Sequence, residues 1–84
     1  MEIVFMSQAW DDYLYWQRQD KKVLKKINEL LKAIGRDSFT GIGSPEPLKH
    51  DLSGYWFRRI TLEHRLVYRV EKGQIRILQC RFHY

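Results

Sequence analysis

The chain has 84 residues, of which 44% are hydrophobic and 14% aromatic, so it is expected to form a single domain (1–84) rather than a disordered chain. The lone cysteine, Cys80, excludes an internal disulfide and favours a reducing cytoplasm, and no apolar run near the start is long enough for a signal peptide or a membrane span. Of the net charge of +5, residues 51–84 carry +4. Such a concentration of positive charge attracts polyanions, but it is also found in basic domains whose charges only keep them soluble.

The start of the chain is expected to form a short strand followed by a helix. Residues 2–6 (EIVFM) are β-prone. Ser7 is a candidate cap for a helix over residues 9–19. Four residues recur at the spacing of one helical face: Trp10, Tyr13, Leu14 and Gln17.

A second helix is expected to begin after Asp20, a capping candidate, and to end at Gly35. Between them runs an amphipathic stripe of apolar residues at helical spacing: Val23, Leu24, Ile27, Leu30, Leu31 and Ile34. Lysines occupy most of the remaining surface. The two helices are expected to form a hairpin.

Residues 36–50 contain two glycines, two serines and two prolines, which predicts a structured loop. Three β-like segments follow, at 53–60, 64–70 and 74–82, with short connections that favour an antiparallel meander. The predicted order is β-α-α-β-β-β. This order is typical of an α+β fold in which a helical hairpin packs on one face of the sheet.

Alternation along the last two strands predicts which side chains face the helices. The expected core set is Leu66, Tyr68, Val70, Leu78, Cys80 and Phe82. The opposite, cationic set is Arg65, Arg69, Arg81 and His83. If Glu71–Gly73 forms a three-residue turn, Arg65 pairs with Gln79 and His83 lies about 13 Å further along the strand. A bulge, twist or bend is then needed to unite Arg65 with His83.

Three residues together fit the metal-free cleavage of RNA, which needs a base for the 2′-hydroxyl, a cation for the phosphorane and an acid for the leaving oxygen. Glu46 lies between two prolines, on stiff backbone suited to a base. Arg65 provides the cation and His83 the acid, since histidine is the side chain generally suited to proton transfer near neutral pH. Tyr84 can stack on a base. Taken singly, each residue is weak evidence: an ordinary surface role explains Glu46 better, whereas Arg65 has a stronger case.

Other constellations are weaker. Cys80 and His83 have the spacing of a metal pair, but alternation places them on opposite faces of the strand. The sequence contains no CxxC or HExxH motif, and no Walker lysine follows the glycines of the loop. Neither a metal nor a cofactor is therefore expected.

Three stretches resemble the YoeB family within the RelE/ParE toxin superfamily: WDDYLYWQRQDKKVLKKINELL, PEPLKHDLSGYWFRRITLEHRLVY and the final HY. The similarity runs nearly end to end. It implies a RelE-like, microbial-ribonuclease-like fold and the toxin of a type II toxin–antitoxin system. Members cut mRNA in the ribosomal A site and leave a 2′,3′-cyclic phosphate.

By matching position, the resemblance implies roles for Glu46 as general base, His83 as general acid, Arg65 as transition-state stabiliser and Tyr84 as a substrate-orienting group. It implies supporting RNA contacts from Lys49, His50 and Arg59. The implied partners are a YefM-like antitoxin, the ribosome with its mRNA, operator DNA through the antitoxin complex, and a second copy of the chain. The alternative is a non-catalytic basic module that binds RNA or an acidic partner and acts as a co-repressor.

Overall fold

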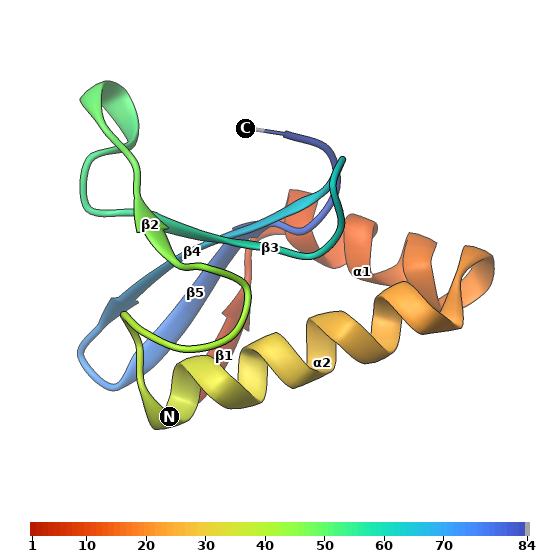
Figure 1. Cartoon of the computed structure of the whole chain (residues 1–84), viewed down its shortest axis with the longest axis horizontal. Helices are drawn as coiled ribbons and strands as arrows, with labels where there is room; N and C mark the ends of the chain where they lie inside the picture. Colours follow the sequence, from red (N-terminus) through yellow and green to blue (C-terminus); the bar gives the residue numbers. More distant parts are fainter. Residues whose placement is uncertain (84) are drawn as a thin grey trace.

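The computed structural model describes residues 1–83, which form two helices and a five-stranded sheet (Figure 1). The elements in chain order are β1 (Glu2–Phe5), α1 (Ser7–Gln19), α2 (Lys21–Arg36), β2 (Glu46–Pro47), the 3-10 turn η1 (His50–Leu52), β3 (Trp56–Arg59), β4 (Arg65–Glu71) and β5 (Gln74–Gln79). The predicted α+β class is confirmed. The short strand β2 was not predicted, because it lies inside the segment expected to be a loop.

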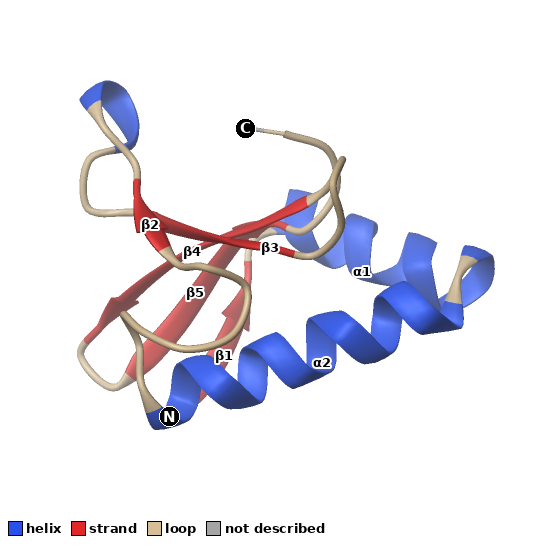
Figure 2. Cartoon of the chain, viewed as in Figure 1, coloured by secondary structure: helices blue, strands red, loops and turns tan. Residues whose placement is uncertain are grey.

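The strands lie in the order β1-β5-β4-β3-β2. β1 runs parallel to β5, whereas the other three pairings are antiparallel, as the predicted meander requires. The two helices lie on one side of the sheet, while η1 and the C-terminal segment rise on the other (Figure 2). Neither helix in the described part of the chain is long and apolar enough to cross a bilayer.

α1 differs from its prediction at its start and in its buried face. Ser7 is the first helical residue and Met6 occupies the cap position, with no side-chain hydrogen bond, so Ser7 does not cap the helix. The buried residues are Ala9, Asp12 and Trp16. This face was missed because a carboxylate and an alanine carry no hydrophobic signal.

α2 follows its prediction more closely. The Asp20 carboxylate accepts hydrogen bonds from the amides of Lys22 and Val23. Five residues of the predicted stripe are buried: Val23, Ile27, Leu30, Leu31 and Ile34. Gly35 does not end the helix, because it keeps a negative φ and the helix continues to Arg36.

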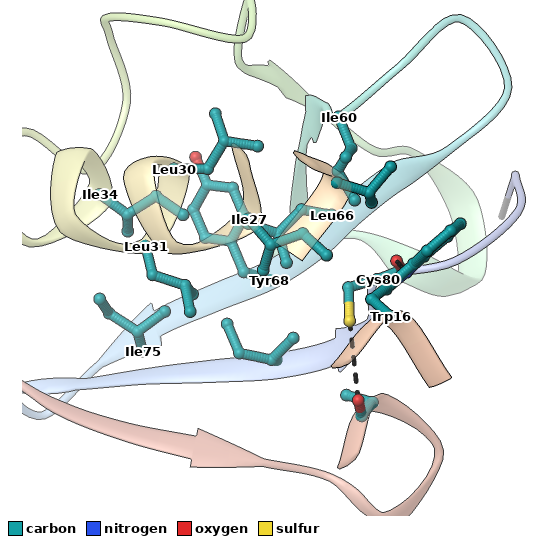
Figure 3. Close-up of a cluster of buried hydrophobic side chains, with 13 residues drawn as sticks. Trp16, Ile27, Leu30, Leu31, Ile34, Ile60, Leu66, Tyr68, Ile75 and Cys80 are labelled. Carbon is teal, nitrogen blue, oxygen red and sulfur yellow. Dashed lines mark hydrogen bonds between the residues drawn. The ribbon is translucent and has the colours of Figure 1, made fainter. Parts of the chain in front are cut away.

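The core lies between the two helices and the facing side of the sheet (Figure 3). Leu66 and Tyr68 of β4 are fully buried there, as predicted, and burial raises the pKa of the Tyr68 hydroxyl. β5 contributes Ile75 and Ile77. The predicted core positions Leu78 and Phe82 are wrong: Leu78 is half-buried outside this cluster and Phe82 is 57% exposed.

The register between β4 and β5 explains this error. The turn has two residues, Lys72 and Gly73, both at positive φ, so Glu71 pairs with Gln74. A bulge then makes Val67 pair with Gln79 while Tyr68 pairs with Ile77. Relative to the predicted register, the turn and the bulge each place a residue one position later in β5 opposite a given residue of β4. The end of the chain is therefore brought closer to the start of β4 than the predicted register allowed.

Arg58 of β3 points toward the helix side of the sheet and is fully buried. Its guanidinium donates to the backbone carbonyls of Asp37, Thr40 and Ile42, and its Nε donates to the Tyr68 hydroxyl. The loop between α2 and β2 is thus wrapped around one buried cation. Because Glu46 follows this loop, Arg58 also fixes the entry to β2.

Gly43 lies in the same loop at φ +84°, and its carbonyl accepts from the Arg59 amide at 2.7 Å. A Cβ there would approach Leu30 Cδ2 to 2.8 Å and Arg58 Cβ to 3.0 Å. We expect Gly43→Ala to lower the free energy of unfolding by about 2–4 kcal/mol, from backbone strain plus overpacking.

The matched control is Gly73→Ala, since Gly73 has φ +74° and no atom within 4 Å of the added Cβ. That variant should lose only the backbone contribution of about 1–2 kcal/mol. Urea denaturation measures both. Equal losses would show that the loop moves aside at Gly43 without resistance.

Candidate active site

A pocket of about 520 Å³ lies on the sheet face away from the helices. It is lined by residues of β2, η1, β3, β4 and the C-terminal segment: Glu46, Pro47, Leu48, Lys49, His50, Leu52, Phe57, Arg59, Arg65 and His83. A second hollow, of about 590 Å³, lies beside the end of α2 and includes none of the predicted site residues. The structure therefore brings six predicted residues to one place.

Glu46 is held at the edge of the sheet by β2. It pairs with Phe57, and Pro47 pairs with Trp56. The Leu48 amide donates to the Tyr55 carbonyl at 2.9 Å, which continues the anchoring beyond the strand. Proline lacks an amide donor, which suits an edge position and keeps the strand short. The carboxylate is exposed on an ordered stretch of backbone.

Lys49 and His50 begin the turn that projects beyond β2. The Lys49 carbonyl accepts from Leu52 and the His50 carbonyl accepts from Ser53. His50 adopts φ +59°, a left-handed conformation that is unfavourable for a residue with a side chain. Both side chains are exposed, and both line the pocket.

Arg65 is almost buried, with 7% of its surface exposed. Its Nη1 donates to the carbonyls of Thr61 and Leu62 at 3.1 Å, and to that of His64 at 3.4 Å. The guanidinium carbon lies 5.7 Å from the Phe57 ring centroid. These contacts orient the guanidinium. Among the described residues 1–83, the hydrogen bonds of the Arg65 side chain all run from Nη1.

His83 lines the pocket from the segment that follows β5, and its carbonyl accepts from Gln79 Nε2 at 3.0 Å. The preceding residue, Phe82, has φ +63°, and its carbonyl accepts from the Arg65 amide at 3.0 Å. A bend at Phe82, together with the bulge, thus brings His83 to Arg65. Tyr84, predicted to orient the substrate, lies outside the described residues.

The predicted cationic face needs correction at one position. Arg81 does not point away from the helices, because its guanidinium carbon lies 3.5 Å from the ring centroid of Tyr15 on α1. The chain bends after β5 and ends the strand alternation on which the prediction relied. Within the part of the chain that the structure describes, Arg69 makes no helix contact of this kind: it pairs with Glu71 and lies over the Tyr55 ring, although it does not line the pocket.

Sequence reasoning also missed part of the pocket. Phe57 lines it, and the alternation of β3 could have shown this, since Phe57 and Arg59 share a face opposite Arg58. Three side chains that hold the segment before His83 were missed as well: Asp12, Trp16 and His64. Each lies far in the sequence from the residue it holds, by 18 to 68 positions, and none belongs to a recognisable motif.

Comparison with known proteins shows the family to which the chain belongs. Residues 5–84 match the model of the YoeB-like toxin of bacterial type II toxin–antitoxin systems. The chain belongs to this toxin family. Toxin YoeB of Escherichia coli strain K12 is 57% identical over 84 residues, which cover the whole of both chains.

Solved YoeB structures agree with this membership. A YoeB/ParE toxin from Agrobacterium tumefaciens is 51% identical, covers both chains completely and superposes with a TM-score of 0.96. YoeB from Staphylococcus aureus has been solved as a dimer, at 54% identity and a TM-score of 0.94, and in a YoeB–YefM complex, at 53% and 0.93. Both alignments cover the whole of this chain and 98% of the other.

The pocket of this YoeB-family chain gathers three kinds of chemical group. Glu46 provides a carboxylate that can accept a proton, and Arg65 a guanidinium that can hold a phosphate. His83 provides an imidazole that can donate a proton. Lys49 and Arg59 add positive charge around them. Such a pocket can bind a phosphodiester and catalyse proton transfer at it.

Proposed function

We propose that this toxin is an endoribonuclease that cuts mRNA in the ribosomal A site, in the cytoplasm, and so inhibits translation. The observation that carries the proposal is the convergence of Glu46, Arg65 and His83 on one basic pocket. These residues come from β2, β4 and the C-terminal segment. Their convergence is the arrangement that acid–base cleavage of RNA requires.

In this proposal Glu46 takes the proton of the 2′-hydroxyl, which attacks the adjacent phosphorus. Arg65 stabilises the charge of the phosphorane, and His83 protonates the departing 5′-oxygen. The products are a 2′,3′-cyclic phosphate and a free 5′-hydroxyl. Lys49, His50 and Arg59 hold the backbone phosphates. Tyr84 orients the substrate by stacking on a base.

The partners follow from the family and from the charge. We propose that a YefM-like antitoxin covers the basic pocket face with an acidic segment, that the toxin forms a homodimer, and that it reaches operator DNA only through the antitoxin complex. The YoeB–YefM complex and YoeB dimer from Staphylococcus aureus support this assignment.

Primer extension on a reporter message in a translating extract tests the activity. The assay should reveal a new 5′ end at the A-site codon, and blocking initiation should abolish it. A non-catalytic RNA-binding module would slow synthesis without a new end, and its effect would fall steeply with added salt.

Metal removal gives a separate prediction. Because the proposed acid, base and cation are all side chains, cleavage of mRNA in the A site should persist at an undiminished rate in EDTA, under conditions that leave the ribosome intact. Gel electrophoresis of the end-labelled RNA measures this. Loss of cleavage that one added metal restores would contradict the proposed mechanism.

A further inference from the structure

The segment Cys80–His83 follows the last residue of β5 and is held mainly by side chains. Asp12 of α1 accepts from the Cys80 amide at 3.0 Å, and the Trp16 indole donates to the Cys80 carbonyl at 2.8 Å. These contacts fix where the segment begins. They leave the direction of the chain at Phe82, immediately before His83, to other groups.

Gln79 Nε2 donates to the carbonyls of Arg81 and His83, on either side of Phe82, at 3.1 and 3.0 Å. His64 makes the side-chain hydrogen bond to Phe82 itself. Its Nδ1 accepts a hydrogen bond from the Phe82 amide at 2.7 Å. A nitrogen that accepts a hydrogen bond carries no proton, so this contact uses the lone pair of Nδ1. The ring also packs edge-on against Trp16, with centroids 4.8 Å apart. His64 therefore links α1, the β3–β4 turn and the C-terminal segment.

We propose that His64 is a positioning residue for His83. Phe82 has φ +63°, which is unfavourable for a side-chain-bearing residue and needs support from its surroundings. The support is one hydrogen bond at each end of the residue: its amide to His64 Nδ1, and its carbonyl from the Arg65 amide. The bond to His64 turns the chain so that His83 lines the pocket. The effect of this positioning on catalysis rests on the proposed function.

Two substitutions separate the acceptor from the ring. His64→Phe keeps an aromatic ring against Trp16 but removes the acceptor. His64→Asn removes the ring but places Oδ1 near the position of Nδ1, where it can accept from Phe82. A positioning role predicts that catalysis follows the acceptor. A merely structural role predicts that catalysis and stability both follow the ring.

Single-turnover cleavage on purified ribosome complexes provides the first measurement. We expect His64→Phe to lower kcat about 10–100-fold with KM within about twofold, because a small displacement of a catalytic group is enough for such a loss. His64→Asn should recover most of kcat. The midpoint of urea unfolding should change in the opposite order, with His64→Asn less stable than His64→Phe. Equal kcat for His64→Phe and the wild type would overturn the proposal.

Amide hydrogen exchange at Phe82, followed by NMR on the free toxin, gives a readout that needs no activity. Exchange should be faster in His64→Phe than in the wild type and near wild-type in His64→Asn. If the wild type cuts no RNA, the proposed function fails, and this measurement still decides whether His64 holds the segment. An unchanged exchange rate of the Phe82 amide in His64→Phe would show that His64 does not hold the C-terminal segment.

Discussion

Replacing His83 by alanine should lower the rate of message cleavage by about 10²–10⁴-fold, the usual contribution of a positioned general acid. The side chain is exposed and contributes nothing to the core, so the free energy of unfolding should stay within about 0.5 kcal/mol of the wild type. Primer extension and urea denaturation, run on the same preparation, measure the two effects.

His50→Ala is the matched control, since His50 is an exposed histidine lining the same pocket. As a proposed phosphate contact it should mainly raise KM, and the difference from the wild type should shrink as salt is added. His83→Ala should instead lower kcat at every salt concentration. Undiminished cleavage by the alanine variant at position 83 would remove this residue from the mechanism.

Arg58→Met should lower the free energy of unfolding by about 3 kcal/mol, a large share of the stability of so small a domain. Methionine keeps the bulk of the side chain but removes every donor to the carbonyls of Asp37, Thr40 and Ile42. The loop between α2 and β2 should lose the side chain that holds its three carbonyls together. Chemical denaturation reports the loss, and amide exchange should rise first within residues 37–45.

Arg76→Met provides the comparison for the loss of an arginine as such. The Arg76 side chain is 44% exposed and pairs with Glu71 across 3.5 Å, an arrangement that contributes little in water. We expect a change below about 0.5 kcal/mol. If both variants unfolded at the same urea concentration, the buried network around Arg58 would have no net stabilising effect.

Elements fixed by local periodicity could be predicted from the sequence. The stripe of α2 depends on spacings of three and four residues, and five of its six members are buried. The cap at Asp20 depends on amides two and three residues away. Both follow from interactions within one turn of helix. Neither requires knowledge of the rest of the fold.

The pairing of β4 with β5 could not be predicted in the same way. A two-residue turn at Lys72–Gly73 and a three-residue turn differ by one position, and lysine at positive φ gives no signal in the sequence. The bulge that follows depends on how well each side chain packs after the shift. Placing Ile77 in the core leaves Leu78 outside the main cluster, and this choice depends on the helices above.

The gathering of the site residues was anticipated from the chemistry of Glu46, Arg65 and His83, but not from geometry. Arg65 and His83 line one pocket because the segment just before His83 is held in place by Asp12, Trp16 and His64. The residues joined by these hydrogen bonds lie up to 68 positions apart in the sequence. No periodicity extends that far. Buried Arg58 illustrates the same limit, since its acceptors are backbone carbonyls that carry no sequence signature.

The place of β5 in the sheet has a consequence for biosynthesis. This strand lies between β1 and β4, so the last strand to be made joins the first strand to the rest of the sheet. A nascent chain can form its helical hairpin early, but it cannot assemble the sheet while residues 74–83 remain in the exit tunnel of the ribosome. A polypeptide interrupted before residue 74 would therefore lack the strand that joins β1 to β4.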